Sequence, residues 1–226
     1  MATQPNYKGA LTQYMTHPEE WTYHIPEGMT TMEGALVEPA AVGMHAAVLG
    51  GAQPGKSIVI LGGGTIGLMV LQACISLGAT DITVVDVIEK RLELAKKLGA
   101  ARVINGKEED TVAVLRSEEM YGDHGVDLVF EAAGAVFTAQ QAVQIVSRGG
   151  KIMMVGTQSK PVPIDFLKIN REVTIQTSFR YCNNFPQTIE AISSGRFNVK
   201  DMVTNIYDYE DVQKAFEEAI DCRKAE

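Results

Sequence analysis

Three glycines and one carboxylate are the residues of this chain whose spacing could do chemistry. Gly62, Gly64 and Gly67 form a G-x-G-x-x-G pattern, and Asp86 follows 19 residues after the last glycine. Such glycines allow a tight turn and a close approach of the backbone to a pyrophosphate, which meets the N–H groups at the start of the next helix. A carboxylate at this offset would accept hydrogen bonds from the hydroxyls of an adenosine ribose and would repel a 2′-phosphate. The pattern therefore predicts a dinucleotide site that prefers NAD to NADP.

The elements around the glycines matter as much as the glycines, because the glycine pattern alone does not specify a dinucleotide site. An apolar, strand-like run occupies 57–61, a helix-period run follows over 66–77, and a second strand-like run over 81–87 ends at the acid. A strand, a glycine turn, a helix and a second strand are the context that a dinucleotide site requires. This context disfavours the alternative, a glycine-rich turn without a ligand beside a solvated aspartate.

Strand-like and helix-like runs continue to alternate as far as residue 177. The further elements that we expect are helices over 89–98, 108–119 and 138–146 and strands over 102–104, 126–130, 151–155 and 173–177. Alternation of this kind indicates a parallel sheet with helices on both faces. The predicted fold class is therefore α/β, with a doubly wound parallel six-stranded sheet and the glycine turn beside its topological switch. Asp127 and Glu131 bracket one strand, and topology alone places an acid at its carboxyl end near the crevice.

The two ends of the chain do not fit this scheme. We expect β-like structure around 14–25 and 202–206, and helices over 33–49, 186–193 and 208–220. These flanks are interpreted as parts of a second domain, which should leave apolar surface exposed at 11–50 and 181–220. The expected division is a first segment over 1–40, a nucleotide-binding domain with a linker helix over 41–180, and a returning segment over 181–226.

Composition limits the classes of partner. The chain has 226 residues, of which 46% are hydrophobic and 21% charged, and a net charge of −8. A negative charge argues against nucleic acid and anionic membrane as partners, and no apolar run approaches the length of a membrane span. The three cysteines share no close spacing, which indicates a reducing, cytoplasmic setting and no zinc cluster.

Several segments, taken in order, resemble the medium-chain, zinc-dependent dehydrogenases, and within them the sorbitol (L-iditol 2-) dehydrogenase branch. These are Gly34-Ala-Leu-Val-Glu-Pro-Ala-Ala-Val-Gly-Met-His45, the glycine pattern, Asp86 with Arg91, Glu131-Ala-Ala-Gly134 and Phe179-Arg-Tyr-Cys-Asn183. The resemblance implies a Rossmann domain with remnants of a GroES-like catalytic domain at both ends. It also implies oxidation of a secondary alcohol of a polyol with NAD, one catalytic zinc per subunit, and a homodimer or homotetramer through the edge strand 173–177.

The resemblance also implies roles for single residues. The expected cofactor contacts are Gly62, Gly64, Thr65, Ile66 and Gly67 at the pyrophosphate, Asp86 and Arg91 at the ribose, and Ala133, Gly134, Val155, Gly156, Thr157 and Phe179 around the nicotinamide. Thr65 stands where proline is common in the family, and Ala133 where threonine is common. Arg180 is expected to reach the active-site water and substrate, or else to form a surface ion pair. Glu38 is expected beside the zinc, although a carboxylate before Pro39 could instead serve only the positive end of a helix.

The zinc ligands of the family are not found in this sequence. The family holds its catalytic zinc with a cysteine and a Gly-His-Glu segment, and no Gly-His-Glu or early cysteine occurs here. Zinc normally needs three protein ligands and an open position. We therefore expect zinc in a full-length parent but not in this chain, which we interpret as truncated and inactive alone.

Other function classes are weighed against this one. A short-chain dehydrogenase needs a tyrosine followed four positions later by a lysine, and none of the seven tyrosines has one. A non-catalytic NAD-binding module, another medium-chain alcohol dehydrogenase and a methyltransferase-like fold remain as alternatives. Titration with NAD against S-adenosylmethionine would separate the methyltransferase from the others.

Overall fold

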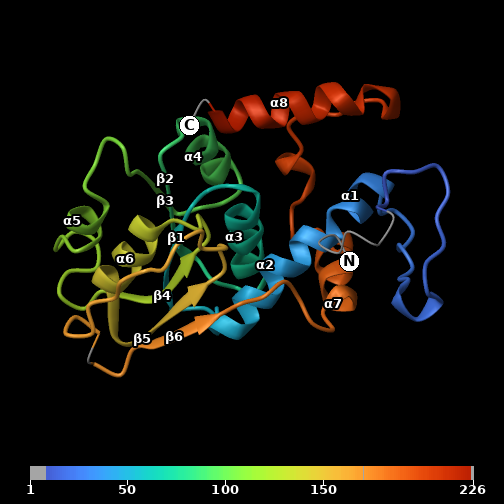
Figure 1. The fold of residues 1–226 in the computed structure, drawn as a ribbon. Coiled ribbons are helices and arrows are strands. Elements are labelled where there is room, and N and C mark those ends of the chain that lie inside the picture. Colours follow the sequence, from blue (N-terminus) through green and yellow to red (C-terminus); the bar gives the residue numbers. More distant parts are fainter. Residues whose placement is uncertain (1–8, 170, 225–226) are drawn as a thin grey trace.

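A parallel sheet forms the centre of the molecule. The computed structural model describes residues 9–169 and 171–224 (Figure 1). The described residues form a six-stranded sheet in the order β3-β2-β1-β4-β5-β6, with every neighbouring pair parallel. The strands are β1 (Ser57–Leu61), β2 (Asp81–Asp86), β3 (Arg102–Asn105), β4 (Val126–Glu131), β5 (Val146–Met154) and β6 (Thr174–Thr177). This confirms the predicted doubly wound α/β fold, whose usual strand order it has.

Some helices connect the strands, and others lie in the chain segments before the first strand and after the last. Those between strands are α3 (Thr65–Ser76), α4 (Glu89–Lys97), α5 (Thr111–Leu115) and α6 (Val136–Ile145). Those in the flanks are α1 (Thr31–Ala35), α2 (Val37–Gly50), α7 (Phe185–Ser193) and α8 (Val212–Lys224). Within the described residues, none of the helices combines the length and the apolar character that crossing a membrane requires.

The alternation of side chains along the strands creates two hydrophobic layers. In β1, Ile58 and Ile60 pack with α2 and α3 on one face of the sheet. Val59 and Leu61 point to the other face and pack with α5 and α6. All four side chains are fully buried, as expected for a parallel sheet covered on both faces.

Two predicted helices differ from the observed ones for local reasons. The helix predicted over 33–49 is divided at Leu36 into α1 and α2. Pro39 has no N–H to donate and is suited only to a first helical turn, so it favours a new start at Val37. The helix predicted over 108–119 is shortened to α5. It begins at Thr111 because the Asp110 side chain caps it by accepting from the N–H groups of Val112 and Ala113, and it ends at Leu115.

The two flanking strands predicted from the sequence are wrong. The described part of the first segment begins at residue 9, and over 14–25 it contains a 3-10 turn, Glu19–Trp21, and irregular chain. All of 202–206 is described, and irregular chain follows the 3-10 turn Lys200–Met202. A strand needs a neighbour to complete its hydrogen-bond ladder, and no strand lies beside either described segment.

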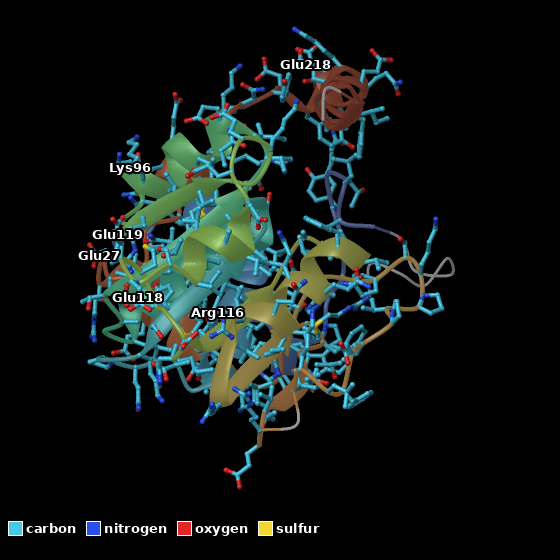
Figure 2. All side chains as sticks on the ribbon, turned by 90° about the vertical axis from the view of Figure 1, so that its left-hand side faces the viewer. Glu27, Lys96, Arg116, Glu118, Glu119 and Glu218 are labelled. Atoms are coloured by element: carbon cyan, nitrogen blue, oxygen red, sulfur yellow. The ribbon has the colours of Figure 1, made fainter. Side chains whose placement is uncertain are left out.

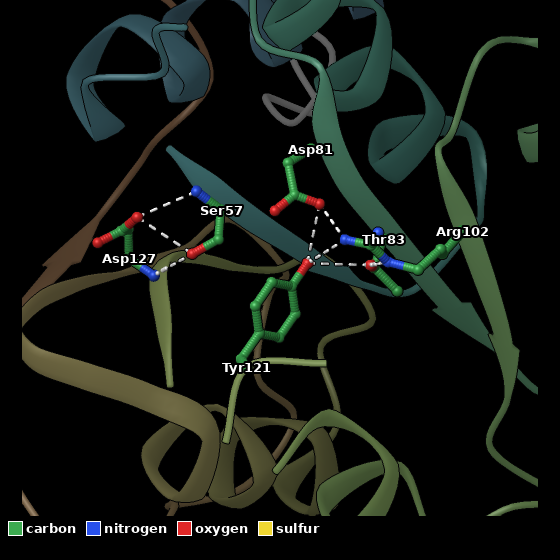
Figure 3. Close-up of polar contacts among 6 residues, drawn as sticks. All are labelled: Ser57, Asp81, Thr83, Arg102, Tyr121 and Asp127. Atoms are coloured by element: carbon green, nitrogen blue, oxygen red, sulfur yellow. Dashed lines mark hydrogen bonds and ion pairs between the residues drawn. The ribbon is translucent and has the colours of Figure 1, made fainter. Parts of the chain in front are cut away.

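The amino ends of the strands are joined by polar side chains (Figure 3). Asp127 on β4 accepts hydrogen bonds from the amide and hydroxyl of Ser57 on β1, at 3.0 and 3.1 Å. On the other side of β1, Arg102 pairs with Asp81 and donates to the Tyr121 hydroxyl at 2.8 Å. These contacts lie at the amino ends of the strands, on the side of the molecule opposite to their carboxyl ends.

A second polar anchor closes the end of α6. Arg116, labelled in Figure 2, donates to the carbonyl oxygens of Gln144 at 3.0 Å and Val146 at 3.1 Å. Burial lowers the pKa of this guanidinium from its ordinary value. The last carbonyls of a helix lack partners within the helix, so Arg116 satisfies groups that the strand and helix ladders leave open.

Apolar side chains are exposed on both flanks, as predicted. Figure 1 shows α8 standing away from the sheet at the end of the segment that follows α7. Phe216 on this helix is 61% exposed, and Ile206 before it is 80% exposed. In the first segment, Tyr14 is 90% and Trp21 57% exposed. Side chains of this size are usually covered by another part of a protein.

Candidate functional site

The predicted cofactor residues meet at the carboxyl ends of the central strands. β1 lies between β2 and β4, so the chain leaves the sheet in opposite directions from β1 and β4. In open parallel sheets, ligands bind in the crevice at this switch in strand order. The glycine turn joins β1 to α3 at this point.

The three glycines of the turn have different geometric reasons to be glycine. Gly62 has a φ of +107°, which disfavours a side chain, and its N–H donates to the Val85 carbonyl at 2.8 Å. A Cβ on Gly67 would lie 1.8 Å from the Gly62 carbonyl oxygen. A Cβ on Gly64, by contrast, would meet no protein atom within 4 Å. The turn is therefore closely packed against the protein and open on the side of Gly64.

The open side coincides with the beginning of α3. Thr65 and Ile66 are the first residues of this helix; Thr65 is exposed and Ile66 half-buried. The first N–H groups of a helix lack intrahelical acceptors and carry the positive end of its dipole. Space beside a glycine at such a helix start suits an anionic group such as a phosphate.

Asp86 is buried at the end of β2 and is attached to the glycine turn. One carboxylate oxygen accepts from the Gly63 N–H at 2.6 Å, and the other accepts from the N–H groups of Val87 at 2.8 Å and Ile88 at 3.0 Å. Arg91 on α4 approaches the first oxygen to 3.6 Å. The carboxylate is thus held in one orientation by three backbone groups, with Arg91 beside it.

The residues predicted at the nicotinamide end form two turns in direct contact. Ala133 and Gly134 follow β4, and 155–157 follows β5. A Cβ on Gly156 would lie 2.3 Å from the Gly134 amide nitrogen, and a Cβ on Gly62 would lie 2.8 Å from the Ala133 amide nitrogen. The glycine turn and these two turns therefore converge on one crevice.

Phe179 and Arg180 follow the carboxyl end of β6. The Ser178 N–H donates to the Met154 carbonyl at 2.8 Å, which places the segment beside the end of β5. The Phe179 ring is 80% exposed, and the Arg180 guanidinium lies 5.3 Å from its centre. Arg180 has a φ of +52°, an uncommon backbone conformation for a residue other than glycine.

Tyr181 connects Arg180 to Glu38. Burial raises the pKa of the Tyr181 phenol, and the negative charge of Glu38 and a hydrogen bond to it raise this pKa further. The charge of Arg180 acts in the opposite direction. The two predicted catalytic residues thus both influence one phenol. The Tyr181 ring also packs edge-to-face on Phe185, with the ring centres 4.9 Å apart.

The zinc that the family resemblance implies finds no matching ligand set in the described part of the chain. No group of three His, Cys, Asp or Glu side chains in the described ranges could hold a metal ion. Glu38 is exposed, in the first turn of α2. These residues do not fit a catalytic zinc site, which needs three protein ligands.

A separate hollow of about 180 Å³ lies between α2, α3 and α7. It is lined by residues such as Met44, Leu77 and Arg196, and none of its lining residues was predicted as a site residue. We assign the candidate site to the crevice rather than to this hollow, because the crevice combines a helix start, an oriented carboxylate and converging turns.

Known proteins resemble this chain along nearly its whole length. The family described as zinc-binding dehydrogenase matches residues 65–194. YdjJ of Escherichia coli (strain K12), an uncharacterised zinc-type alcohol dehydrogenase-like protein, is 64% identical over 224 residues, which cover 99% of this chain and 64% of that protein. The sorbitol dehydrogenase of Bacillus subtilis is 39% identical over 223 residues, which cover 97% of this chain and 62% of that protein.

Solved structures show the same fold. An oxidoreductase/dehydrogenase of unknown specificity from Escherichia coli, involved in membrane biogenesis, has a TM-score of 0.95 and 64% identity, over 99% of this chain and 64% of that one. A putative zinc-binding dehydrogenase from Sinorhizobium meliloti, bound to NADP, has a TM-score of 0.77 and 27% identity, over 80% of this chain and 54% of that one. The chain thus spans somewhat less than two thirds of the length of these relatives. Since the family match covers more than half of the chain, the chain belongs to the zinc-binding dehydrogenase family, a family of oxidoreductases.

Proposed function

We propose that this chain binds NAD(H) and is the nucleotide-binding portion of a polyol dehydrogenase, which oxidises a secondary alcohol to a ketone. The observation that carries this proposal is the buried Asp86 carboxylate, held at the glycine turn by three backbone N–H groups. A carboxylate has about four lone-pair positions, so one remains for a ribose hydroxyl. NAD would accept the hydride that leaves the alcohol carbon.

Each predicted residue has a place in this proposal. Gly62, Gly64, Thr65, Ile66 and Gly67 would hold the pyrophosphate, Asp86 and Arg91 the adenosine ribose, and Ala133, Gly134, Val155, Gly156, Thr157 and Phe179 the nicotinamide half. Arg180 would orient the substrate, and Glu38 would stand beside the reacting centre of the parent enzyme. Because the described residues do not fit a zinc site, we assign no step to zinc here and expect no alcohol oxidation by the chain alone.

The preference for NAD over NADP follows from charge. A 2′-phosphate would be placed next to the Asp86 carboxylate, which has little access to water to screen the repulsion. The Sinorhizobium meliloti relative was solved with NADP, so membership of the family does not decide between the two cofactors.

The substrate class and the assembly are argued from other observations. Similarity to the sorbitol dehydrogenase of Bacillus subtilis favours a polyol over other alcohols. We divide the chain into a catalytic-domain segment at 1–40, the nucleotide-binding domain at 41–180 and a returning segment at 181–226. We also propose a homodimer or homotetramer through β6, and a cytoplasmic location, which the scattered cysteines favour.

Calorimetric titration tests the cofactor. We expect the chain to bind NADH, to bind NADPH at least about tenfold more weakly, and to lose at least about tenfold in NADH affinity in Asp86→Ala, as expected for loss of charge-assisted hydrogen bonds. Asp86→Asn is the closer control, since it keeps the size of the side chain but removes its charge. It should weaken NADH binding and narrow the gap to NADPH.

The opposite results would reject parts of the proposal. A chain that binds neither nucleotide is not a dinucleotide-binding module, and one that binds S-adenosylmethionine instead belongs to another class of enzyme. Equal affinity for NADH and NADPH in the unchanged chain would remove the role of Asp86 in cofactor choice. Formation of NADH from NAD and sorbitol by the chain alone would refute the expectation that it is inactive.

A further inference from the structure

Glu131 is a fully buried carboxylate that the proposed function leaves without a role. It is the last residue of β4, and 0% of it is exposed. Charged side chains are almost never fully buried unless their charge is compensated. We infer that Glu131 is a positioning residue, which holds the two turns around the nicotinamide half of the cofactor in register. This inference rests on the proposed function.

The side chain of Glu131 binds both turns at once. Its Oε1 atom accepts from the N–H groups of Ala133 at 3.1 Å and Gly134 at 2.8 Å, and lies 2.7 Å from the Thr138 hydroxyl on α6. Its Oε2 atom accepts from the Gln158 side-chain amide at 2.7 Å. One carboxylate thus joins the turn after β4, the first turns of α6 and the turn after β5.

The backbone of Glu131 repeats this connection. Its carbonyl oxygen accepts from the N–H groups of Val155 at 2.9 Å and Gly156 at 2.8 Å. Gly156 fits because it has no side chain, since a Cβ there would lie 2.8 Å from Oε2 of Glu131 and 2.3 Å from the Gly134 amide nitrogen. The turns are therefore packed on each other through Glu131.

Glu131 cannot contact the cofactor directly, because it is fully enclosed by protein. Its effect must pass through the turns, and the adenosine half is held by a separate set of contacts. Asp86 is bound by Gly63, Val87 and Ile88, none of which contacts the Glu131 carboxylate. Loss of Glu131 should therefore weaken binding of the nicotinamide half and spare the adenosine half.

Two substitutions separate the hydrogen bonds of Glu131 from its volume. Glu131→Leu keeps a side chain of similar size but leaves the N–H groups of Ala133 and Gly134 without their acceptor. Glu131→Gln keeps one oxygen for these N–H groups. Its new NH₂ group could donate to Gln158, whose side-chain oxygen is buried without a partner and would be brought into place by a reversal of that amide. We expect Glu131→Gln to retain the site.

Titration with two ligands is the test. NADH carries both halves of the cofactor, whereas ADP-ribose lacks the nicotinamide. In Glu131→Leu we expect NADH affinity to fall at least about tenfold, because buried N–H groups have lost their acceptor. We expect ADP-ribose affinity to fall less, by no more than about threefold. The contacts of Asp86 at the ribose share no partner with Glu131, and only Gly62 of the glycine turn packs on Ala133. Glu131→Gln should stay within about threefold of the unchanged chain for both ligands.

Asp127→Ala is the matched control for a general loss of stability. It removes a carboxylate from the other end of the same strand, where it binds Ser57, and should leave both affinities unchanged. If Glu131→Leu does not fold by circular dichroism, Gln158→Met serves in its place. That variant removes only the bond to Oε2 and should lower NADH affinity about threefold, again without changing that of ADP-ribose.

The outcomes distinguish this inference from the proposed function. Equal losses for NADH and ADP-ribose, or no loss for either, would show that Glu131 does not position the nicotinamide half. A strong NADH defect in Glu131→Gln would equally refute the hydrogen-bond argument. If the unchanged chain binds neither ligand, the proposed function itself fails, and this inference with it.

Discussion

At the scale of single residues, two glycines of the glycine turn differ in role: one is required by packing and the other by ligand binding. Gly67 is enclosed by the Gly62 carbonyl, whereas the position of a Cβ on Gly64 is free of protein atoms. The two glycines belong to the same sequence pattern, yet only position 67 must be glycine for the turn to fold. Position 64 must be glycine only if a ligand binds beside it.

Alanine at each of these two positions should have opposite consequences. Gly67→Ala should cost on the order of 1–3 kcal/mol of unfolding free energy, because its Cβ overlaps the Gly62 carbonyl oxygen. Gly64→Ala should cost at most about 1 kcal/mol, the usual loss when glycine is replaced by alanine at a helix N-cap. Its NADH affinity should nevertheless fall sharply, since the methyl group occupies the space proposed for the pyrophosphate. Urea unfolding and NADH titration of both variants measure the two effects. Normal NADH binding by Gly64→Ala would contradict the proposed position of the phosphates.

At the scale of elements, a capping box explains why α1 begins where it does. The Glu33 N–H donates to the Thr30 hydroxyl oxygen at 3.2 Å, and the Glu33 carboxylate accepts from the Thr30 N–H at 2.8 Å. The Thr30 backbone and side-chain hydrogen bonds hold the pKa of Glu33 below its ordinary value, and Lys200, 3.3 Å away, lowers it further. A short helix is thereby joined to the segment that follows α7.

The capping box should make the free energy of unfolding of the chain depend on pH. A carboxyl group whose pKa is lowered by folding stabilises the folded state above its unfolded pKa. This contribution is lost as the pH falls through the lower folded-state value. Thr30→Ala should therefore cost about 1 kcal/mol at neutral pH, the typical value for an N-cap, and progressively less below pH 4.5, the ordinary pKa of Glu33. Urea unfolding of the variant and the unchanged chain across this range measures the difference. A difference that grows as the pH falls would contradict this interpretation.

At the scale of the whole molecule, the described chain exposes an edge strand and several large apolar side chains. β6 pairs only with β5 among the described strands, and Ile175 on it is 37% exposed. An uncharged edge strand can pair with another copy of itself. The apolar side chains of the first segment and of α8 form a second exposed surface, which fits with the chain spanning less of its relatives than their full length.

A charge on the edge strand should prevent self-association. We expect the chain to sediment as a dimer or larger at high concentration, and Ile175→Lys to shift it toward monomer, because lysine disfavours pairing of strand edges. Val87→Lys, directly after β2, is the matched control, since Val87 is 52% exposed and three strands separate β2 from β6 in the sheet. Sedimentation velocity of the three proteins measures the effect. A chain that is monomeric throughout would refute association through β6.

The sequence by itself determined the sheet, the glycine turn and the place of Asp86. These features depend on local signals: apolar runs of strand length, helix-period runs that end at Gly78 and Gly99, and an acid at a definite offset. In a parallel α/β fold each strand is followed by its own crossover helix, so the order along the chain already contains most of the topology. The glycine turn and the turns after β4 and β5 meet for the same reason.

Only the tertiary structure decided which partners the side chains have and which conformation the two flanking segments adopt. Glu131 was visible in the sequence as an acid at a strand end. Its four donors come from two turns and a helix that meet only after β4 and β5 have paired. The interaction of Tyr181 with Glu38 depends in the same way on tertiary contacts, because Tyr181 packs on Phe185 of α7 and α7 packs against α2. The predicted flanking strands had strand-like residues but no neighbour to pair with. A strand is completed by hydrogen bonds to distant parts of a chain, and these cannot be read from its own residues.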